Sequence, residues 1–551
     1  MKEGFRQSMA WLHTWTGVVV GWVLFFVFVT GTAGYVDNEI TRWMKPELPL
    51  AGQAQKGERD TQVRLALDRL EAVAPGARNW TVTLPHQSLN PRGEHPFLIS
   101  WEDMPGRNHE QGRRGSEILD PVTGEFSVET EGRATGGGGL LYRMHYILHY
   151  MPYQTGIALV GACTMLMFLA ILSGVITHKK IFTDFFTFRP GKGQRSWLDA
   201  HNVVSVMSLP FFLMITYTGL MFFAFDYMPA ARDVVYGSTQ ADRQAYFREA
   251  FPRDTGPHDP MVRPAADVAG LVARAEAEWG VGKVAGVRMA RPQGEPAYVD
   301  VTRVVDGRLL VYVADRLRYS AEDGRPLAHD DRRSNTQNVR DVMFSLHEGL
   351  FANWWLRWLY VVMGLMGCAV IGTGLVMWTV KRRTQHQKKH GSSRLDAAGL
   401  RVVEVLNAGT LVGLPLAVAA YFWANRLLPV SLGSRPDWEA HCMFLVWGWS
   451  FLYASLRPLK RAWLELLWLT VAAYALLPVL NALTTQRHLG VTLPHGDWGL
   501  AGFDLSMLGL AAIFAYIAHK LRRRWLGAVA QARPAAGAVP VTARESTTCA
   551  P

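Results

Sequence analysis

Long apolar stretches recur along this chain of 551 residues and indicate its architecture. A helix needs about 20 mostly apolar residues to cross the hydrocarbon core of a bilayer. The stretches cover residues 11–35, 153–177, 203–225, 355–380, 402–424, 441–456, 462–483 and 499–519. The sixth is short and the fifth is interrupted by Pro415. The pattern therefore predicts a polytopic α-helical membrane protein with about eight transmembrane helices.

Two polar segments between these stretches, 37–142 and 226–343, repeat one order of elements. Each combines apolar residues at helical spacing with short runs of alternating polarity, which are typical of strands. The predicted helices and strands are 61–74, 80–84 and 97–101 in the first segment and 266–280, 284–290, 297–304 and 309–315 in the second. Polar turns at 120–126 and 320–327 are expected to cap hairpins. Each segment is therefore predicted to form a small α+β module outside the membrane, with one helix on an antiparallel sheet.

The first 390 residues form a two-fold repeat of helix, soluble segment and helix. His13 lies 17 residues before Thr30, His201 lies 17 residues before Thr218, and glycine follows each threonine. The repeat divides the chain into a first transmembrane helix (1–36), a first module (37–142), a second helix (143–178), a basic cytoplasmic loop (179–198), a third helix (199–225), a second module (226–343), a fourth helix (344–380), a basic cytoplasmic linker (381–400), a four-helix extension (401–521) and a tail expected to be disordered (522–551). We expect the first four helices to form a pseudo-two-fold bundle.

Histidines in matching positions of the repeat are the candidate functional residues. Parallel repeats are related by an axis along the membrane normal, which pairs His13 with His201 at one end and His347 with His145 or His149 at the other. An ionisable side chain inside a bilayer is costly and by default indicates a functional site. Because neutral imidazole suits iron, the pairs predict axial ligands of haem. His145 and His149 are expected one turn apart on one helix face, so one would bind iron and the other a propionate or the substrate.

The same histidines and glycines also have simpler explanations than haem binding. A lone histidine at a membrane interface is most often only an interfacial polar residue, and His178, whose counterpart in the second half is Trp378, can equally bind a propionate or belong to a loop. Several helix glycines can give clearance to a haem, although close helix packing explains most of them as well. No C-x-x-C-H motif is present, which excludes covalent attachment of a c-type haem.

The net charge of +11 follows membrane topology and not a nucleic-acid partner. Basic residues gather in the loops that face one side, for example in 381–390 and 519–524, whereas the short loops on the other side carry few. By the positive-inside rule both termini are cytoplasmic, and the modules lie outside. The cytoplasmic loops are too short for a nucleotide-binding domain, so electrons would come from quinol or another donor.

Five segments resemble signature stretches of the PepSY-associated transmembrane helix family. They are WLHTWTGVVVGW (11–22), YRMHYILHY (142–150), ITHKKIFTDFFTFRP (176–190), LDAHNVVSVMSLPFFLMITYTGL (198–220) and LHEGLFANWWLRWLY (346–360). The resemblance covers residues 1–390 and extends loosely into 398–427, which is similar to extended, iron-regulated members. It implies two periplasmic PepSY modules on a four-helix bundle in the bacterial inner membrane. For the best-understood members it also implies b-type haems and reduction of ferric siderophores.

The sequence and the resemblance together predict an inner-membrane ferric-siderophore reductase with two b-type haems. The inner haem would be held by His13 and His201, and the outer haem by His347 with His145 or His149. The expected partners are a ferric siderophore, quinol or another electron donor, membrane lipid and periplasmic iron-uptake proteins. Two alternatives remain: a non-redox regulator that binds a periplasmic peptidase through its modules, and a transporter of iron or siderophore.

Overall fold

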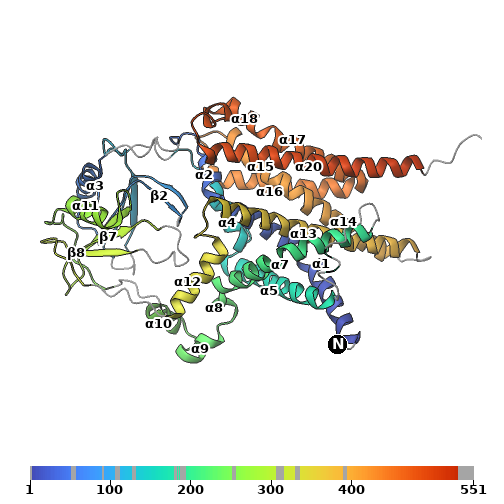
Figure 1. The fold of residues 1–551 in the computed structure, drawn as a ribbon, viewed down its shortest axis with the longest axis horizontal. Coiled ribbons are helices and arrows are strands. Elements are labelled where there is room, and N and C mark those ends of the chain that lie inside the picture. Colours follow the sequence, from blue (N-terminus) through green and yellow to red (C-terminus); the bar gives the residue numbers. More distant parts are fainter. Residues whose placement is uncertain are drawn as a thin grey trace, which may run out of the picture.

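The structure is a computed structural model with two parts, a soluble sheet domain and a helical membrane part (Figure 1). It describes residues 3–50, 58–89, 92–105, 112–126, 132–178, 183, 185, 194–250, 256–305, 315–328, 335–388 and 394–531. The sheet domain lies at one end of the helices, and the N-terminus lies at the opposite end (Figure 1). We call positions in the helical part proximal when they lie toward the sheet domain and distal when they lie away from it.

Four long helices of the repeat form the first bundle. They are α1 (Glu3–Gly34), α5 (Tyr153–Thr177), α7 (Gln194–Phe222) and α13 (Trp354–Lys388). Helix α1 contacts α5 and α13, and α7 contacts the same two helices, so the four close a ring. This arrangement places the two halves of the repeat opposite each other.

Each half of the repeat also contains a short helix just before its closing long helix. These are α4 (Gly137–Tyr146) and α12 (Asn335–Glu348), which precede α5 and α13. Pro152 directly precedes α5 and disfavours helical conformation in the residue before it, and Tyr150 has a φ of 66°. The expectation that His145 and His149 share one helix face is therefore wrong, because α4 ends at Tyr146 and His149 lies in the break.

The two soluble segments do not form two separate sheets. Their strands join in one antiparallel sheet of order β5-β4-β1-β6-β7-β8, which consists of β1 (Asn79–Thr83), β4 (Leu98–Glu102), β5 (Arg114–Ile118), β6 (Val284–Ala290), β7 (Tyr298–Arg303) and β8 (Arg316–Ser320). The central pair β1 and β6 comes from different segments, with Thr81 opposite Arg288. The prediction of one small sheet per module is corrected: pairing through β1 and β6 leaves neither strand as an open edge.

Most of the elements predicted for the soluble segments are present. Helices α3 (Arg59–Val73) and α11 (Val268–Trp279) pack on each other and on the sheet, and share one apolar core with it. The polar turns cap hairpins, since Leu119 pairs with Phe126 and Tyr319 with Pro326. The strand predicted at 309–315 falls almost wholly outside the described residues. The sequence also did not predict strands β5 and β8 of the sheet. The other elements that it did not predict are α2 (Asp37–Met44), β2 (His86–Leu89), β3 (Arg92–His95), α8 (Ala224–Tyr227), α9 (Ala230–Tyr236) and α10 (Gln240–Ala250).

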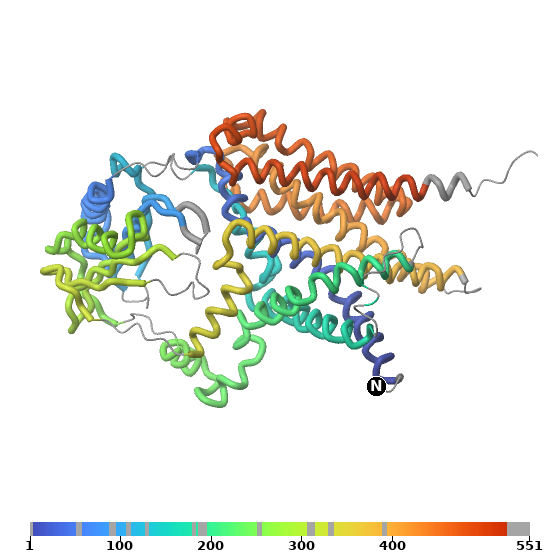
Figure 2. The backbone as a smooth tube through the Cα atoms, viewed as in Figure 1, coloured from blue at the N-terminus to red at the C-terminus, as the bar shows by residue number. Residues whose placement is uncertain are grey.

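A second group of helices, the C-terminal extension, packs beside the first bundle (Figure 2). It consists of α14 (Arg394–Ala408), the π-helical turn η2 (Gly409–Gly413), α15 (Leu414–Leu427), α16 (Arg435–Leu456), α17 (Leu459–Ala475), α18 (Leu477–Thr484), α19 (Leu489–Thr492) and α20 (Trp498–Gln531). Helix α20 continues through the first part of the predicted disordered tail, whose residues 532–551 lie outside the described ones.

Seven helices in the described part of the chain are long and apolar enough to cross a membrane, one fewer than the predicted eight. The predicted sixth stretch, 441–456, lies in α16, which is not among the seven. Its first two turns carry Arg435, Asp437, Glu439 and His441, and these polar residues lower its hydropathy. The chain is therefore a membrane protein, and α16 is the helix on which its number of crossings depends.

Candidate functional site

A cavity of about 470 Å³ opens between the four long helices at the distal end of the bundle. Its walls include His13 from α1, His201 from α7 and His178 at the end of α5. The other lining residues are mostly aliphatic, such as Val20, Leu209 and Ile371. Its size and apolar walls are those of a small-molecule or cofactor site.

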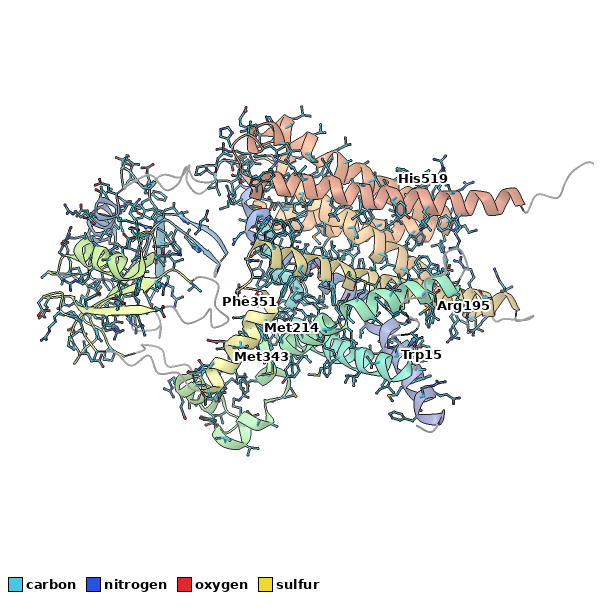
Figure 3. The ribbon with its side chains drawn as sticks, viewed as in Figure 1. Trp15, Arg195, Met214, Met343, Phe351 and His519 are labelled. Atoms are coloured by element: carbon cyan, nitrogen blue, oxygen red, sulfur yellow. The ribbon has the colours of Figure 1, made fainter. Side chains whose placement is uncertain are left out.

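A second cavity, also of about 470 Å³, lies at the proximal end. His145 from α4 and His347 from α12 line it, together with a group of tyrosines that the distal cavity lacks. Figure 3 shows the two ends: Phe351 and Met343 mark the side of the sheet domain, and Trp15 and Arg195 mark the far side. The predicted histidines are therefore gathered in two cavities at opposite ends of one bundle.

In each cavity two histidine rings lie close together, at a similar distance in both. The ring centres of His13 and His201 are 6.3 Å apart, and those of His145 and His347 are 5.9 Å apart. An imidazole nitrogen lies about 2.0–2.1 Å from bound zinc and the ring centre about 1.1 Å further out, so two imidazoles on opposite sides of a similar metal ion have centres about 6.3 Å apart. The spacing of both pairs therefore allows two imidazoles to hold one metal ion between them.

The Nδ1 atoms of all four histidines bond to backbone carbonyl oxygens. His13 pairs with Ala170 O at 2.8 Å and His201 with Val370 O at 3.0 Å. The proximal pair repeats this pattern, with His145 on Val27 O at 2.8 Å and His347 on Ile215 O at 3.0 Å. Because a carbonyl oxygen only accepts, each Nδ1 carries the proton and donates it, which leaves the lone pair on Nε2. Histidines that bind metals are oriented in this way.

Four glycines allow the imidazole rings to come this close to the neighbouring helices. A Cβ atom on Gly31 would lie 2.4 Å from the ring of His145, and one on Gly219 would lie 2.8 Å from the ring of His347. In the distal cavity the corresponding distances are 3.1 Å between Gly174 and His13 and 3.4 Å between Gly374 and His201. A hydroxyl residue precedes each of these glycines in the sequence. The sequence alone suggested that most helix glycines serve close helix packing. The Ser-Gly or Thr-Gly pair that recurs in each of the four helices was the sequence signal for these glycine–histidine contacts.

The remaining two candidate histidines lie differently. His149 is not among the residues that line either cavity, and its ring stacks on Phe444 of α16 at 5.3 Å. His178 lines the distal cavity, where its Nε2 accepts a hydrogen bond of 2.8 Å from Asn202. The geometry therefore places His145 opposite His347 and gives His149 no position in the pair.

Buried polar atoms without a protein partner add to the description of the cavities. Among the described residues, Nδ1 of His178 and the hydroxyl of Ser205 are such atoms on the distal wall, and the hydroxyl of Thr216 is one on the proximal wall. Lys381 lines the distal cavity as well. An unsatisfied buried donor costs free energy, so these atoms are available to the polar groups of a ligand. The donor set suits an apolar cofactor with carboxylate groups.

The proximal cavity is more polar than the distal one. Tyr142 donates a hydrogen bond of 2.9 Å to Glu348, and both residues line the cavity. Burial raises the pKa of Tyr227 to about 12 and also raises the pKa of Tyr146. Both phenols therefore stay protonated at neutral pH and can donate hydrogen bonds to a ligand.

Three side-chain groups border both cavities. Leu24, Phe28 and Met167 line the distal and the proximal cavity alike. The two cavities are therefore neighbours that share part of a wall.

The described residues contain no cluster of three or more His, Cys, Asp or Glu side chains that could hold a metal ion. A metal at either pair would need its other ligands from a cofactor, and a porphyrin supplies four nitrogen atoms.

Comparison with known proteins covers the part of the chain that forms the first bundle and the sheet domain. The model of the PepSY-associated TM region matches residues 10–381. This chain belongs to the PepSY-associated transmembrane family. The family match includes all four paired histidines and ends within α13, before the C-terminal extension. A Pseudomonas aeruginosa protein, the uncharacterised protein PA4219, is 26% identical over 419 residues, which cover 72% of this chain and 96% of that protein.

Proposed function

We propose that this PepSY-associated protein binds two b-type haems and passes electrons across the bacterial inner membrane to a ferric siderophore in the periplasm. His13 and His201 would hold the distal haem, and His145 and His347 the proximal one. The observation that carries the proposal is the pair of opposed imidazoles, each oriented by a backbone carbonyl, that recurs in both cavities. The haems would supply one-electron redox chemistry at the iron.

The protein's own residues would position, insulate and connect the two cofactors. The four carbonyl contacts fix the imidazoles with Nε2 toward the metal position. A haem held by two histidines would supply one-electron transfer and not oxygen chemistry. The mostly aliphatic walls of the distal cavity would insulate the cofactor, and the shared wall of Leu24, Phe28 and Met167 makes the two sites adjacent. His178 and Lys381 line the distal cavity and would bind cofactor carboxylates.

The side of the reaction follows from the charge distribution. The basic residues in 381–388 of α13 and 519–524 of α20 lie at the distal end, which the positive-inside rule assigns to the cytoplasm (Figure 1). A hydrophilic ferric chelate cannot enter the bilayer, but it can approach the proximal cavity below the sheet domain. Reduction releases the metal, because hard oxygen ligands hold Fe(III) far more tightly than Fe(II). Quinol or a separate reductase would supply the electrons.

The deciding measurement is a visible spectrum of the purified protein with a pyridine haemochrome count. We expect two b-type haems per chain, and one fewer in each of His13→Ala, His201→Ala, His145→Ala and His347→Ala. His149→Ala is the matched control and should retain both, because His149 stacks on Phe444 away from the cavities. A colourless protein would refute the proposal and favour the regulator of a peptidase.

The substrate is tested separately from the cofactor. Reduced, haem-replete protein should be reoxidised anaerobically by a ferric siderophore, and Fe(II) should appear in a ferrozine-type trap. In vesicles of known orientation the chelate should act only from the side of the sheet domain. If none of several ferric siderophores reoxidised the protein, the reductase assignment would be wrong even with both haems present.

A further inference from the structure

The C-terminal extension packs against the first bundle around α2 and α4. Leu140, Leu141 and Met144 of α4 share one buried apolar core with residues of α15 and α16, including Tyr421 and Met443. Helix α4 carries His145 in its last turn. The extension therefore contacts the short helix that supplies one of the proximal histidines.

Helix α4 begins in a run of four glycines, so its own chain supplies no capping side chain inside the run. Gly137 has a φ of +57°, and a Cβ on Gly138 would lie 2.1 Å from the carbonyl oxygen of Asp37. This close approach fits α4 against α2, and Gly138 N donates to the hydroxyl of Thr41 at 2.9 Å. The glycines allow tight packing but leave the start of a ten-residue helix weakly held by its own sequence.

A carboxylate from the extension binds the residues that lead into α4, where the hydroxyl of Thr135 accepts a hydrogen bond of 3.1 Å from Gly137 N. Glu439 of α16 accepts hydrogen bonds from the hydroxyl of Thr135 at 2.6 Å and from Gly136 N at 3.1 Å. A negative charge at a helix N-terminus is stabilising, because the first backbone N–H groups are unpaired and the helix dipole is positive there. Glu439 thus holds the N-terminus of α4, directly through Gly136 N and indirectly through the hydroxyl of Thr135 that accepts from Gly137 N.

Further contacts hold this cap in place. Arg435 and Glu439 are both fully buried and form an ion pair of 2.6 Å. Arg435 also donates to Ala134 O at 2.8 Å, and Tyr421 donates to Gly137 O at 2.9 Å. Asn425 donates to the second oxygen of Glu439 at 2.8 Å. The segment that leads into α4 is therefore bound by side chains from both α15 and α16.

We propose that the C-terminal extension clamps α4, and that Glu439 is a positioning residue that keeps His145 opposite His347. The inference rests on the proposed haem function for its spectroscopic readout, but its structural readout does not. The clamp gives a role to helices that lie outside the family match. Glu439 acts through α4 and does not itself line the proximal cavity.

The test combines a haem count with hydrogen exchange on Glu439→Gln, which removes the charge and retains the shape. We expect haem to fall from two per chain toward one, with the loss confined to the spectral signals that His145→Ala also removes. Exchange in the peptide that covers α4 should rise about tenfold or more, while α12 stays unchanged. Thr135→Val removes the hydroxyl that donates to Glu439 and accepts from Gly137 N and Asn425, and it leaves Glu439 paired with Arg435. It should shift both readouts in the same direction and serves if Glu439→Gln does not fold.

Glu404→Gln is the matched control, because it breaks an ion pair between Arg383 of α13 and Glu404 of α14 at the distal end of the same extension. It should leave α4 and the proximal haem unchanged. The clamp is refuted if Glu439→Gln folds with normal exchange in α4 and an unaltered proximal signal. If the wild-type protein held no haem, the proposed haem function would be refuted. Hydrogen exchange in α4 would still show whether the C-terminal extension clamps this helix.

Discussion

At the scale of single residues, glycines and histidines act together in this protein. A methyl group on Gly31 would overlap the ring of His145, whose Nδ1 is already fixed by Val27 O, whereas one on Gly174 would only press on His13. Overpacking in a well-packed site costs about 1–3 kcal/mol. We therefore predict that Gly31→Ala removes most of the proximal haem, that Gly174→Ala weakens the distal haem less, and that Gly502→Ala changes neither. Gly502 is the control because a Cβ there meets no atom within 4 Å. Haem counts on the three variants check the order, and equal effects of all three would contradict it.

A second residue-scale prediction concerns pH. His86 of β2 is buried, its Nδ1 bonds to Leu84 O at 2.7 Å, and burial lowers its pKa from 6.5 to about 4. Because the folded state holds the neutral form, its stability is complete above pH 6.5 and declines as the pH falls from 6.5 toward 4. The local opening equilibrium should increase by up to about tenfold per pH unit in that window. Hydrogen exchange of the β2–β3 hairpin at pH 7 and pH 5 measures this, and His86→Leu should lose the pH dependence. The same dependence in both proteins would assign it to another group.

At the scale of elements, the pairing of β1 with β6 makes the two soluble segments one folding unit. Arg288 lies in the middle of β6 and its side chain is exposed, so a substitution there tests the backbone alone. Arg288→Pro removes a backbone donor from a central strand, which is strongly disfavoured. We predict that it lowers hydrogen-exchange protection in both segments together, whereas Arg288→Ala leaves both protected. Loss of protection confined to 226–343 would show that the first segment folds independently of the second.

At the scale of the whole molecule, the orientation in the membrane decides which cavity meets which compartment. Val281 in the sheet domain is 90% exposed, and Leu395 at the distal start of α14 is 83% exposed. After replacement of the native cysteines, a membrane-impermeant maleimide should label Val281→Cys in intact spheroplasts. It should label Leu395→Cys only after permeabilisation, because the positive-inside rule predicts that the distal end with its basic residues faces the cytoplasm. The reverse pattern would place the proximal cavity in the cytoplasm and exclude a periplasmic substrate.

The sequence alone determined the long apolar helices, the repeat, and the register of His13 with His201. These features are local, because apolar length reports membrane crossing and equal spacing reports equal position in a repeat. It also located α3, α11 and most strands of the sheet. It did not determine the break at residues 147–152, so it could not decide between His145 and His149.

Tertiary structure decided that choice and the contacts between segments far apart in the chain. A helical pattern continues through Tyr146 to Tyr150, and only the positive φ of Tyr150 and the packing of His149 on Phe444 separate the two histidines. The pairing of β1 with β6, and the contact of Glu439 with Thr135 across 304 residues, join segments whose sequences carry no mark of each other. An open strand edge or a buried charge can pair with many other segments of the chain. The folded structure selects one pairing, because all buried polar groups must find partners at the same time.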